Sequence, residues 1–269
     1  MSSRWTVRGS VREPLQGLNV IVTRPRHQAD ALLEALASAG AHAISFPTIR
    51  IAPRSVTTSP GDDFDAVIFV SVNAVQHGSW VASTRTASAP VIAVGAATAA
   101  ALLDHGVVAQ TPAEANSEGV LAMPAIRALH AGMRVLLVRG VGGRATLPVG
   151  LRARSIEVVV AEVYERQCPA VDPAAAARLA EAGFRDHVAL ATSVETFENL
   201  VSLLGTEHTT VLARVGYFAA VSQRIGDHIR ATLGGQLHHP VWQLTGAGVH
   251  PIVTGLRDNW VHVSAGRTG

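Results

Sequence analysis

Four turns of this sequence place small or hydroxyl-bearing residues where an apolar strand is expected to end and a helix to begin. They are Thr23-Arg24-Pro25, Ser71-Val72-Asn73, Gly95-Ala96-Ala97-Thr98 and Thr192-Ser193. The first turn of a helix presents unpaired backbone N–H groups and a positive dipole end, and together these bind anions. Ordinary helix capping explains any one turn equally well. Four such turns together favour a site for an anionic small molecule.

A glycine-rich turn, Gly140-Val141-Gly142-Gly143-Arg144, offers a second kind of anion site. It lacks the G-x-G-x-x-G spacing of a dinucleotide-binding loop, and a simple flexible turn is the alternative interpretation. Arg139 and Arg144 flank it, and guanidinium groups pair readily with carboxylates. We therefore treat the two arginines as candidate ligands of a carboxylate.

Tyr164 stands at the end of an apolar strand, just before Glu165-Arg166. Its phenol can donate a proton or a hydrogen bond to a ligand, or it can simply pack with its hydroxyl in solvent. No Ser-His-Asp set and no paired carboxylates stand out. His238-His239 and His250 lack the i, i+4 spacing that would support a metal site. We expect neither a metal nor a cofactor.

The composition excludes several classes of chemistry. The sequence contains no lysine, so its 22 basic residues are all arginine, and Schiff-base lysine chemistry and a Walker-type phosphate loop are ruled out. The formal net charge of +2 is scattered along the chain, so we expect no nucleic-acid partner.

The single cysteine, Cys168, excludes an internal disulfide and suits a reducing compartment. The apolar run from Val91 to Leu103 is too short to cross a membrane. We expect a cytoplasmic monomer, with no secretion signal and no membrane contact.

These candidate groups depend on an alternation of strands and helices. Apolar strands are predicted at 20–22, 66–70, 90–94, 107–109, 134–138, 156–164, 188–191 and 211–218, and most are followed by a helical pattern. After 107–109, the segment from Glu114 to Ser117 leads into a helix that is expected to run through Leu129. This alternation predicts an α/β fold with parallel sheets covered by helices on both faces, and ligands bind beyond the carboxyl ends of such strands. Pro47 predicts an edge or linker strand at 43–51. The tail after Gly235 has no clean pattern, and either packs on the first lobe or serves a partner.

The sequence also contains a diverged internal repeat. Val20-Ile21-Val22 and Ala43-Ile44 match Val135-Leu136-Leu137 and Val158-Val159 at the same offset of 115 residues. A duplicated unit predicts two similar lobes. A cleft between domains is a preferred place for a small-molecule site, so we expect the ligand there.

Several segments form a further pattern, in order over residues 18 to about 234. They are Val22-Thr23-Arg24-Pro25, Phe69-Val70-Ser71-Val72-Asn73-Ala74-Val75, Val94-Gly95-Ala96-Ala97-Thr98-Ala99, Ser117-Glu118-Gly119-Val120-Leu121, Leu137-Val138-Arg139-Gly140, Val163-Tyr164-Glu165-Arg166 and Ala220-Val221-Ser222-Gln223-Arg224-Ile225. Together these segments resemble the uroporphyrinogen-III synthase family. The last segment departs from the Gly-x-x-Thr turn of many relatives.

The resemblance implies two flavodoxin-like α/β lobes joined by a two-stranded linker at 46–51 and 163–166. The first lobe would be discontinuous, comprising 15–47 plus 166–262, and the second would comprise 50–163. Residues 1–14 would form a flexible arm.

The resemblance also implies a reaction: hydroxymethylbilane, a linear tetrapyrrole, closes with loss of water and inversion of its terminal ring. Loss of the hydroxyl gives an azafulvene, and attack by the substituted ring carbon gives a spiro intermediate. The enzyme would act chiefly by holding the chain in the correct geometry. The substrate, and the enzyme that produces hydroxymethylbilane, are the partners this implies. A non-catalytic two-lobed sensor or binding module is the main alternative, and a sugar-nucleotide or phosphate transferase is a weaker one.

Site roles follow from the resemblance. Tyr164 would donate a proton to the leaving hydroxyl. The remaining candidates would bind the substrate through hydroxyls, backbone amides or guanidinium groups: Thr23, Arg24, Ser71, Asn73, Gly95, Thr98, Ser117, Arg139, Gly140, Arg144, Thr192, Ser193, Ser222 and Arg224.

Overall fold

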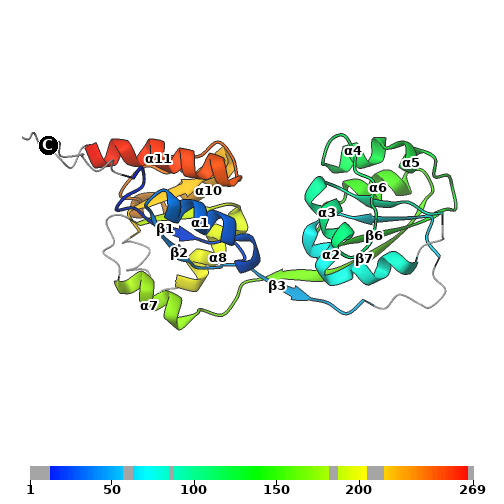
Figure 1. The fold of residues 1–269 in the computed structure, drawn as a ribbon, viewed down its shortest axis with the longest axis horizontal. Helices are drawn as coiled ribbons and strands as arrows, with labels where there is room; N and C mark the ends of the chain where they lie inside the picture. The colour runs from blue at the N-terminus through cyan, green and yellow to red at the C-terminus, as the bar shows by residue number, and fades with distance from the viewer. Residues whose placement is uncertain (1–12, 57–62, 85–87, 182–186, 205–214, 266–269) are drawn as a thin grey trace, which may run out of the picture. The chain divides into compact units, whose positions relative to one another are not determined.

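The structure is a computed structural model that describes residues 13–56, 63–84, 88–181, 187–204 and 215–265. The chain divides into two compact units, with the boundaries between Arg50 and Ile51 and between Gln167 and Cys168. Unit 1 therefore contains both ends of the chain, and unit 2 is one continuous segment (Figure 1). The expected flexible arm, residues 1–14, lies almost entirely outside the described residues.

Unit 1 contains a five-stranded sheet in the order β10-β9-β8-β1-β2, in which every neighbouring pair is parallel. Its strands are β1 (Asn19–Val22), β2 (His42–Ser45), β8 (His187–Ala191), β9 (Tyr217–Ala220) and β10 (Trp242–Gln243). Its helices are α1 (Asp30–Ser38), α7 (Pro173–Glu181), α8 (Val194–Leu204), α10 (Gln223–Leu233) and α11 (Val249–Ala265), with 3₁₀ turns at Arg26–Gln28 and Gly234–Gln236.

Unit 2 contains a second five-stranded sheet in the order β3-β7-β6-β4-β5, whose β7-β6-β4-β5 pairs are parallel. Its strands are β3 (Arg50–Pro53), β4 (Ala66–Phe69), β5 (Val91–Ala93), β6 (Arg134–Gly140) and β7 (Glu157–Gln167). Its helices are α2 (Val72–Gly78), α3 (Ala96–Asp104), α4 (Ser117–Ala122), α5 (Pro124–Arg127) and α6 (Thr146–Arg152), with a 3₁₀ turn at Ser79–Thr84. The predicted α/β class is confirmed.

The sheet of unit 2 separates two apolar cores. Leu136 and Val138 of β6 pack with residues of α2 and α3, whereas Val135 and Leu137 pack with residues of α4, α5 and α6. Successive side chains of a strand point to opposite faces, so a strand covered on both sides needs a continuous apolar run. This explains why the run Val-Leu-Leu-Val predicts a central strand. Figure 1 shows helices on both sides of this sheet.

The strand pairing agrees with the internal repeat. Asn19 of β1 pairs with His42 of β2, and Arg134 of β6 pairs with Glu157 of β7. Each residue of the second pair lies 115 positions after its equivalent, which is the offset found in the sequence. The β1–β2 and β6–β7 units therefore correspond without a gap.

Three predicted elements differ from the structure. The strand expected at 107–109 is absent, and this region forms only an isolated bridge between Ile92 and Gln110. The helix expected through Leu129 is broken into α4 and α5, because Pro124 has no N–H to continue the first helix and begins the second. Of the strand expected at 211–218, residues 211–214 lie outside the described residues, and β9 begins at Tyr217.

The tail after Gly235 belongs to unit 1. β10 adds to the edge of the sheet beside β9, and α11 packs against α1. The Trp260 indole donates a hydrogen bond to the Gln16 carbonyl at 3.2 Å. Of the two expectations for this tail, packing on the first lobe is confirmed.

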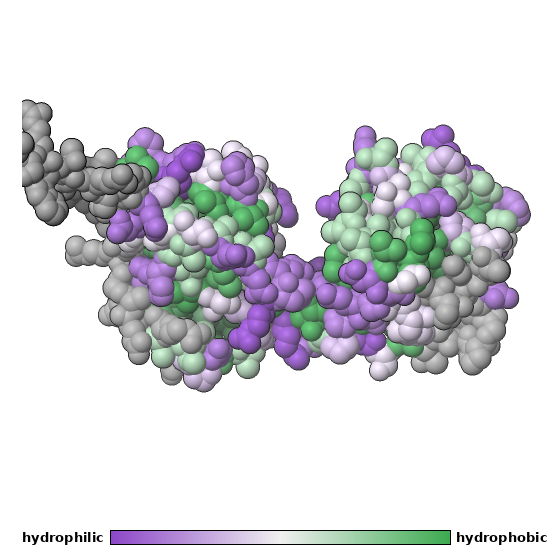
Figure 2. All heavy atoms as spheres, viewed as in Figure 1, coloured by the Kyte–Doolittle hydropathy of each residue, from purple (hydrophilic) through white to green (hydrophobic). Residues whose placement is uncertain are grey.

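The linking segments contain edge strands, as Pro47 predicts. β2 is the last strand of one sheet and β3 is the first strand of the other. The return strand, β7, continues past Tyr164 to Gln167 and is longer than expected. In Figure 2 the segments that join the two units carry mainly hydrophilic residues.

Candidate functional site

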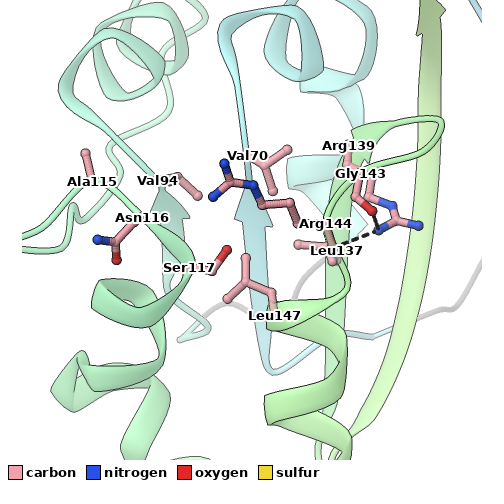
Figure 3. A pocket seen from close by; sticks show the side chains of 10 residues that line it. All are labelled: Val70, Val94, Ala115, Asn116, Ser117, Leu137, Arg139, Gly143, Arg144 and Leu147. Atoms are coloured by element: carbon pink, nitrogen blue, oxygen red, sulfur yellow. Dashed lines mark hydrogen bonds between the residues drawn. The ribbon is translucent and has the colours of Figure 1, made fainter. Parts of the chain in front are cut away.

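Unit 2 has a pocket of about 260 Å³ at the carboxyl ends of β4, β5 and β6. This is the edge at which open parallel sheets bind ligands. Apolar side chains from the strands and α6 form the floor, and polar groups come from the α4 and β6–α6 loops (Figure 3). Its lining residues are Val70, Val94, Ala115, Asn116, Ser117, Leu137, Arg139, Gly143, Arg144 and Leu147.

The wall around α4 depends on a cap and a close backbone approach. The side-chain oxygen of Asn116 accepts a hydrogen bond from the Gly119 N–H at 2.7 Å, which caps α4. A Cβ on Gly119 would lie 2.1 Å from the Glu114 carbonyl oxygen, so only glycine fits there. Together these contacts fix Ser117, the first residue of α4, against the pocket.

The loop between β6 and α6 supplies the cation of the pocket. Figure 3 shows the Arg144 guanidinium reaching into the middle of the pocket, with Asn116 and Ser117 on the α4 side. Arg139, expected to bind the substrate, also lines the pocket, and its terminal nitrogens bond to the protein. Its Nη2 donates to Glu162 at 3.1 Å, and its Nη1 donates to the carbonyls of Gly143 at 3.1 Å and Arg144 at 3.3 Å. Both arginines line the pocket, and Arg144 is the one whose guanidinium extends into its middle.

Tyr164 lies on the other face of the same sheet edge and does not line this pocket. The residue is 5% exposed and belongs to the α2–α3 core. Its hydroxyl oxygen lies 3.2 Å from the Ser71 hydroxyl, which in turn accepts a hydrogen bond from the Ala74 N–H at the start of α2. A phenol and a capping serine thus form one hydrogen-bonded pair.

Gly140, expected to bind the substrate, lies close to the Tyr164 ring in the structure. It is buried, and a Cβ on it would lie 2.5 Å from Cζ of Tyr164 and 2.9 Å from its hydroxyl oxygen. The missing side chain therefore makes room for the phenol ring. The substrate contact of Gly140 stays a prediction, and in the structure Gly140 lies against the Tyr164 ring.

The other candidates of unit 2 lie at the same edge. Asn73 lies half-buried in the first turn of α2. Gly95 is the N-cap of α3, and Thr98 is buried in its first turn. Ser71, Gly95 and Ser117 thus stand at the starts of three helices, as the turns predict.

Two candidates of unit 1 have structural partners. Thr23 is fully buried, and its hydroxyl donates to the Leu190 carbonyl at 2.7 Å, so that hydroxyl is not available to a ligand. The Arg24 guanidinium donates to the carbonyl of Ala247, and burial lowers the pKa of Arg24 by desolvation. The Thr23-Arg24-Pro25 turn leads into a 3₁₀ turn at Arg26–Gln28 rather than directly into an α-helix, and α1 begins only at Asp30.

The remaining candidates of unit 1 follow β8 and β9. Thr192 and Ser193 separate β8 from α8, and Ser193 forms a reciprocal cap with Thr196: each hydroxyl accepts from the other residue's N–H at 3.0 Å. Ser222 is the N-cap of α10 but makes no capping hydrogen bond with its side chain. Arg224 is exposed in the first turn of α10.

Two site residues were missed by the sequence reasoning. Asn116 precedes Ser117 and stands three residues before Gly119, which is the spacing of an N-cap. The sequence alone therefore indicates Asn116 as the cap of this helix. Glu162 lies within an apolar strand, and nothing in its neighbourhood indicates Arg139 as its partner.

Among the described residues, no group of three His, Cys, Asp or Glu side chains is placed to hold a metal ion. Likewise, none of the described helices has the length and hydropathy needed to span a membrane.

Comparisons with known proteins point to one family. Residues 30–232 match a family model described as uroporphyrinogen-III synthase HemD. The chain is 32% identical over 244 residues to uroporphyrinogen-III synthase of Salmonella typhimurium, covering 81% of this chain and 93% of that protein. It is 31% identical over 211 residues to a putative uroporphyrinogen-III synthase of Methanothermobacter thermautotrophicus, covering 72% and 82%. The fold is similar to the crystal structure of uroporphyrinogen-III synthetase from Helicobacter pylori, with a TM-score of 0.53, 16% identity, and 91% and 99% of the chains covered.

Proposed function

The chain belongs to the uroporphyrinogen-III synthase family, and we propose that it closes hydroxymethylbilane to uroporphyrinogen III with loss of water and inversion of ring D, a step of haem biosynthesis. One observation carries the proposal. The carboxyl edge of unit 2 combines a pocket containing a guanidinium group with a phenol paired to a serine. The guanidinium group can bind an anionic substrate, and the phenol–serine pair can give a proton to a leaving hydroxyl.

The pocket is the proposed binding site for one carboxylate arm of the substrate. Its volume of about 260 Å³ is below the ~300 Å³ at which pockets begin to hold a drug-sized ligand, so it suits part of a tetrapyrrole. Arg144 would pair with the carboxylate, and Ser117 would donate a further hydrogen bond. The apolar floor, including Leu147, would contact the pyrrole ring.

Tyr164 is the proposed source of the proton for the leaving hydroxyl. Because the phenol is almost fully buried and Ser71 is more exposed, we propose a relay. Ser71 gives its hydroxyl proton to the leaving group and takes the phenol proton from Tyr164. The C–O bond then breaks and water departs, leaving the protonated, cationic azafulvene. The proton that the substrate loses when the ring closes returns to Tyr164, so the enzyme ends unchanged.

The choice of product is proposed to come from positioning. Holding the reacting carbons at the correct distance and angle contributes roughly 7–11 kcal/mol in favourable cases, so a conventional nucleophile is not required. Thr192, Ser193 and Ser222 are the proposed carboxylate contacts of unit 1, because they follow the carboxyl ends of its strands. Asn73, Gly95, Thr98 and Arg224 remain proposed contacts on the same argument.

Two expectations about partners and location stay predictions. The first is an encounter with the enzyme that supplies hydroxymethylbilane. The second is a cytoplasmic monomer. Size-exclusion chromatography with light scattering on the purified protein tests whether it is a monomer. The same measurement on a mixture with the supplying enzyme tests whether the two proteins bind each other.

The proposed function is tested by the isomer that forms. Purified protein is incubated with enzymatically generated hydroxymethylbilane, and the oxidised porphyrins are separated by chromatography. The type III isomer is expected. If only the type I isomer forms, as in buffer alone, the proposal fails and a non-catalytic binding module becomes the better interpretation.

A further inference from the structure

We infer that the Arg139–Glu162 ion pair is a positioning element for the reaction. It fixes the loop that carries Arg144, and it fixes the strand register that aims Tyr164. The inference rests on the proposed function, and it assigns to this pair no contact with the substrate.

The pair joins two neighbouring strands. Arg139 of β6 and Glu162 of β7 are direct partners in the sheet, and their side chains meet at 3.1 Å. The two side chains are 17% and 32% exposed, so solvent screens this pair less than it screens an ion pair on the open surface. Glu162 therefore holds the Arg139 guanidinium in one orientation.

That orientation fixes the β6–α6 loop. The second terminal nitrogen of Arg139 donates to the carbonyls of both Gly143 and Arg144. The loop also lies close to the Arg139 stem, since a Cβ on Gly143 would be 3.0 Å from Cδ of Arg139. The backbone from which the Arg144 side chain enters the pocket is thus attached to Arg139, and through it to Glu162.

The same pair stands immediately before an irregularity in the sheet. Arg139 pairs with Glu162, but the next residue, Gly140, pairs with Tyr164, so Val163 has no partner on β6. Strict alternation would put Tyr164 on the face of Glu162, opposite Ala161 and Val163. Instead Tyr164 packs in the same core as those two residues. The extra residue turns the phenol toward Ser71, as bulges do near active sites.

A second ion pair on the same strands provides the matched control. Arg134 and Glu157 are also direct partners on β6 and β7, with side chains 3.2 Å apart. They lie at the amino ends of the strands, away from the pocket and from Tyr164. Loss of this pair shows how much an ion pair between these strands contributes when it lies away from the candidate site.

The experiment compares Glu162→Gln with Glu157→Gln. Both variants keep the side-chain shape and remove the charge. We expect Glu162→Gln to lower kcat/KM about tenfold or more, through a lower kcat and a higher KM, because misplacement by about 1 Å is costly. Glu157→Gln should stay within about twofold of the wild type. Unchanged kinetics in Glu162→Gln, or equal losses in both variants, would overturn the inference. If Glu162→Gln does not fold, Glu162→Asp is compared with Glu157→Asp on the same criteria.

A double variant tests the link to the loop. If Glu162 acts through the placement of Arg144, then Arg144→Gln raises KM less in the Glu162→Gln background than in the wild type. Fully additive effects would contradict the loop part of the inference. Failure of the proposed function is distinguishable, because it is read from the isomer made by the wild-type protein alone.

Discussion

The hydroxyl oxygens of Ser71 and Tyr164 lie 3.2 Å apart, although the two residues are separated by 93 positions in the chain. The Ser71 oxygen also accepts the Ala74 N–H at 3.1 Å, so it is held by the start of α2. A serine in this position is more than a helix cap, since it connects a buried phenol to a more exposed group. The contact makes both residues testable by removal of one oxygen.

Replacing Tyr164 by Phe removes the phenol oxygen and keeps the ring packed on Gly140. We expect kcat to fall at least about tenfold, the contribution typical of a general acid, with little change in the thermal midpoint. Steady-state kinetics and thermal unfolding check this. The other tyrosine of the chain, Tyr217 in β9, is also buried and provides the control. Tyr217→Phe should keep wild-type turnover, and wild-type turnover in Tyr164→Phe would remove this residue from the mechanism.

Replacing Ser71 by Ala removes the helix cap and the proposed relay together. The cap contributes about 1 kcal/mol to the free energy of unfolding, so stability should fall by that amount. Turnover should fall about as far as in Tyr164→Phe, whereas Ser71→Thr should keep most of the activity. Asp172, whose carboxylate accepts the Ala174 N–H at 3.0 Å next to α7, gives a cap without a relay. If Asp172→Ala reduces turnover to the same extent as Ser71→Ala, the effect is one of stability alone.

The sequence predicts most strands because each is an apolar run that ends in a turn, and its repeat predicts the pairing of β1 with β2 and β6 with β7. It does not predict α11. Pro251 and Gly255 weaken the helical pattern there. The helix forms because Leu256 and Trp260 are buried in the core of unit 1, and because Gly255 lies where a Cβ would be 2.7 Å from the Leu244 side chain. Tertiary packing thus outweighs local preference.

The candidate site was predictable in its location and less so in its contacts. Hydroxyl and guanidinium groups were expected at the carboxyl ends of the strands, and Ser117 and Arg144 lie in such a pocket. Which of these groups the protein itself uses depends on neighbours that are distant in sequence. Thr23 bonds to Leu190, and Arg139 bonds to Glu162. The direction of the Tyr164 side chain follows from a one-residue shift in strand pairing. The regular alternation of side chains along a strand cannot predict such a shift.

Replacing Gly140 by Ala places a methyl group against the Tyr164 ring. The methyl carbon would lie within 2.5 to 2.9 Å of three ring or hydroxyl atoms, so the ring must move. We expect the free energy of unfolding to fall by about 1–3 kcal/mol, as in other overpacked cores. We also expect kcat to fall by a larger factor than the factor by which KM changes. Kinetics and chemical denaturation measure the two effects. A Cβ at Gly235 meets no atom of the described residues within 4 Å, so Gly235→Ala is the control and should change neither stability nor kinetics.

Replacing Arg144 by Gln removes the cation from the pocket and keeps a polar side chain. A hydrogen bond to a charged group contributes about 1.5–3 kcal/mol, so we expect KM for hydroxymethylbilane to rise about tenfold or more. Because the interaction is electrostatic, added salt should raise KM less in the variant than in the wild type. Arg127, exposed at the end of α5 in the same unit, provides the control for loss of one positive charge. If Arg127→Gln raises KM as much as Arg144→Gln, the effect comes from net charge, and the pocket is not the carboxylate site.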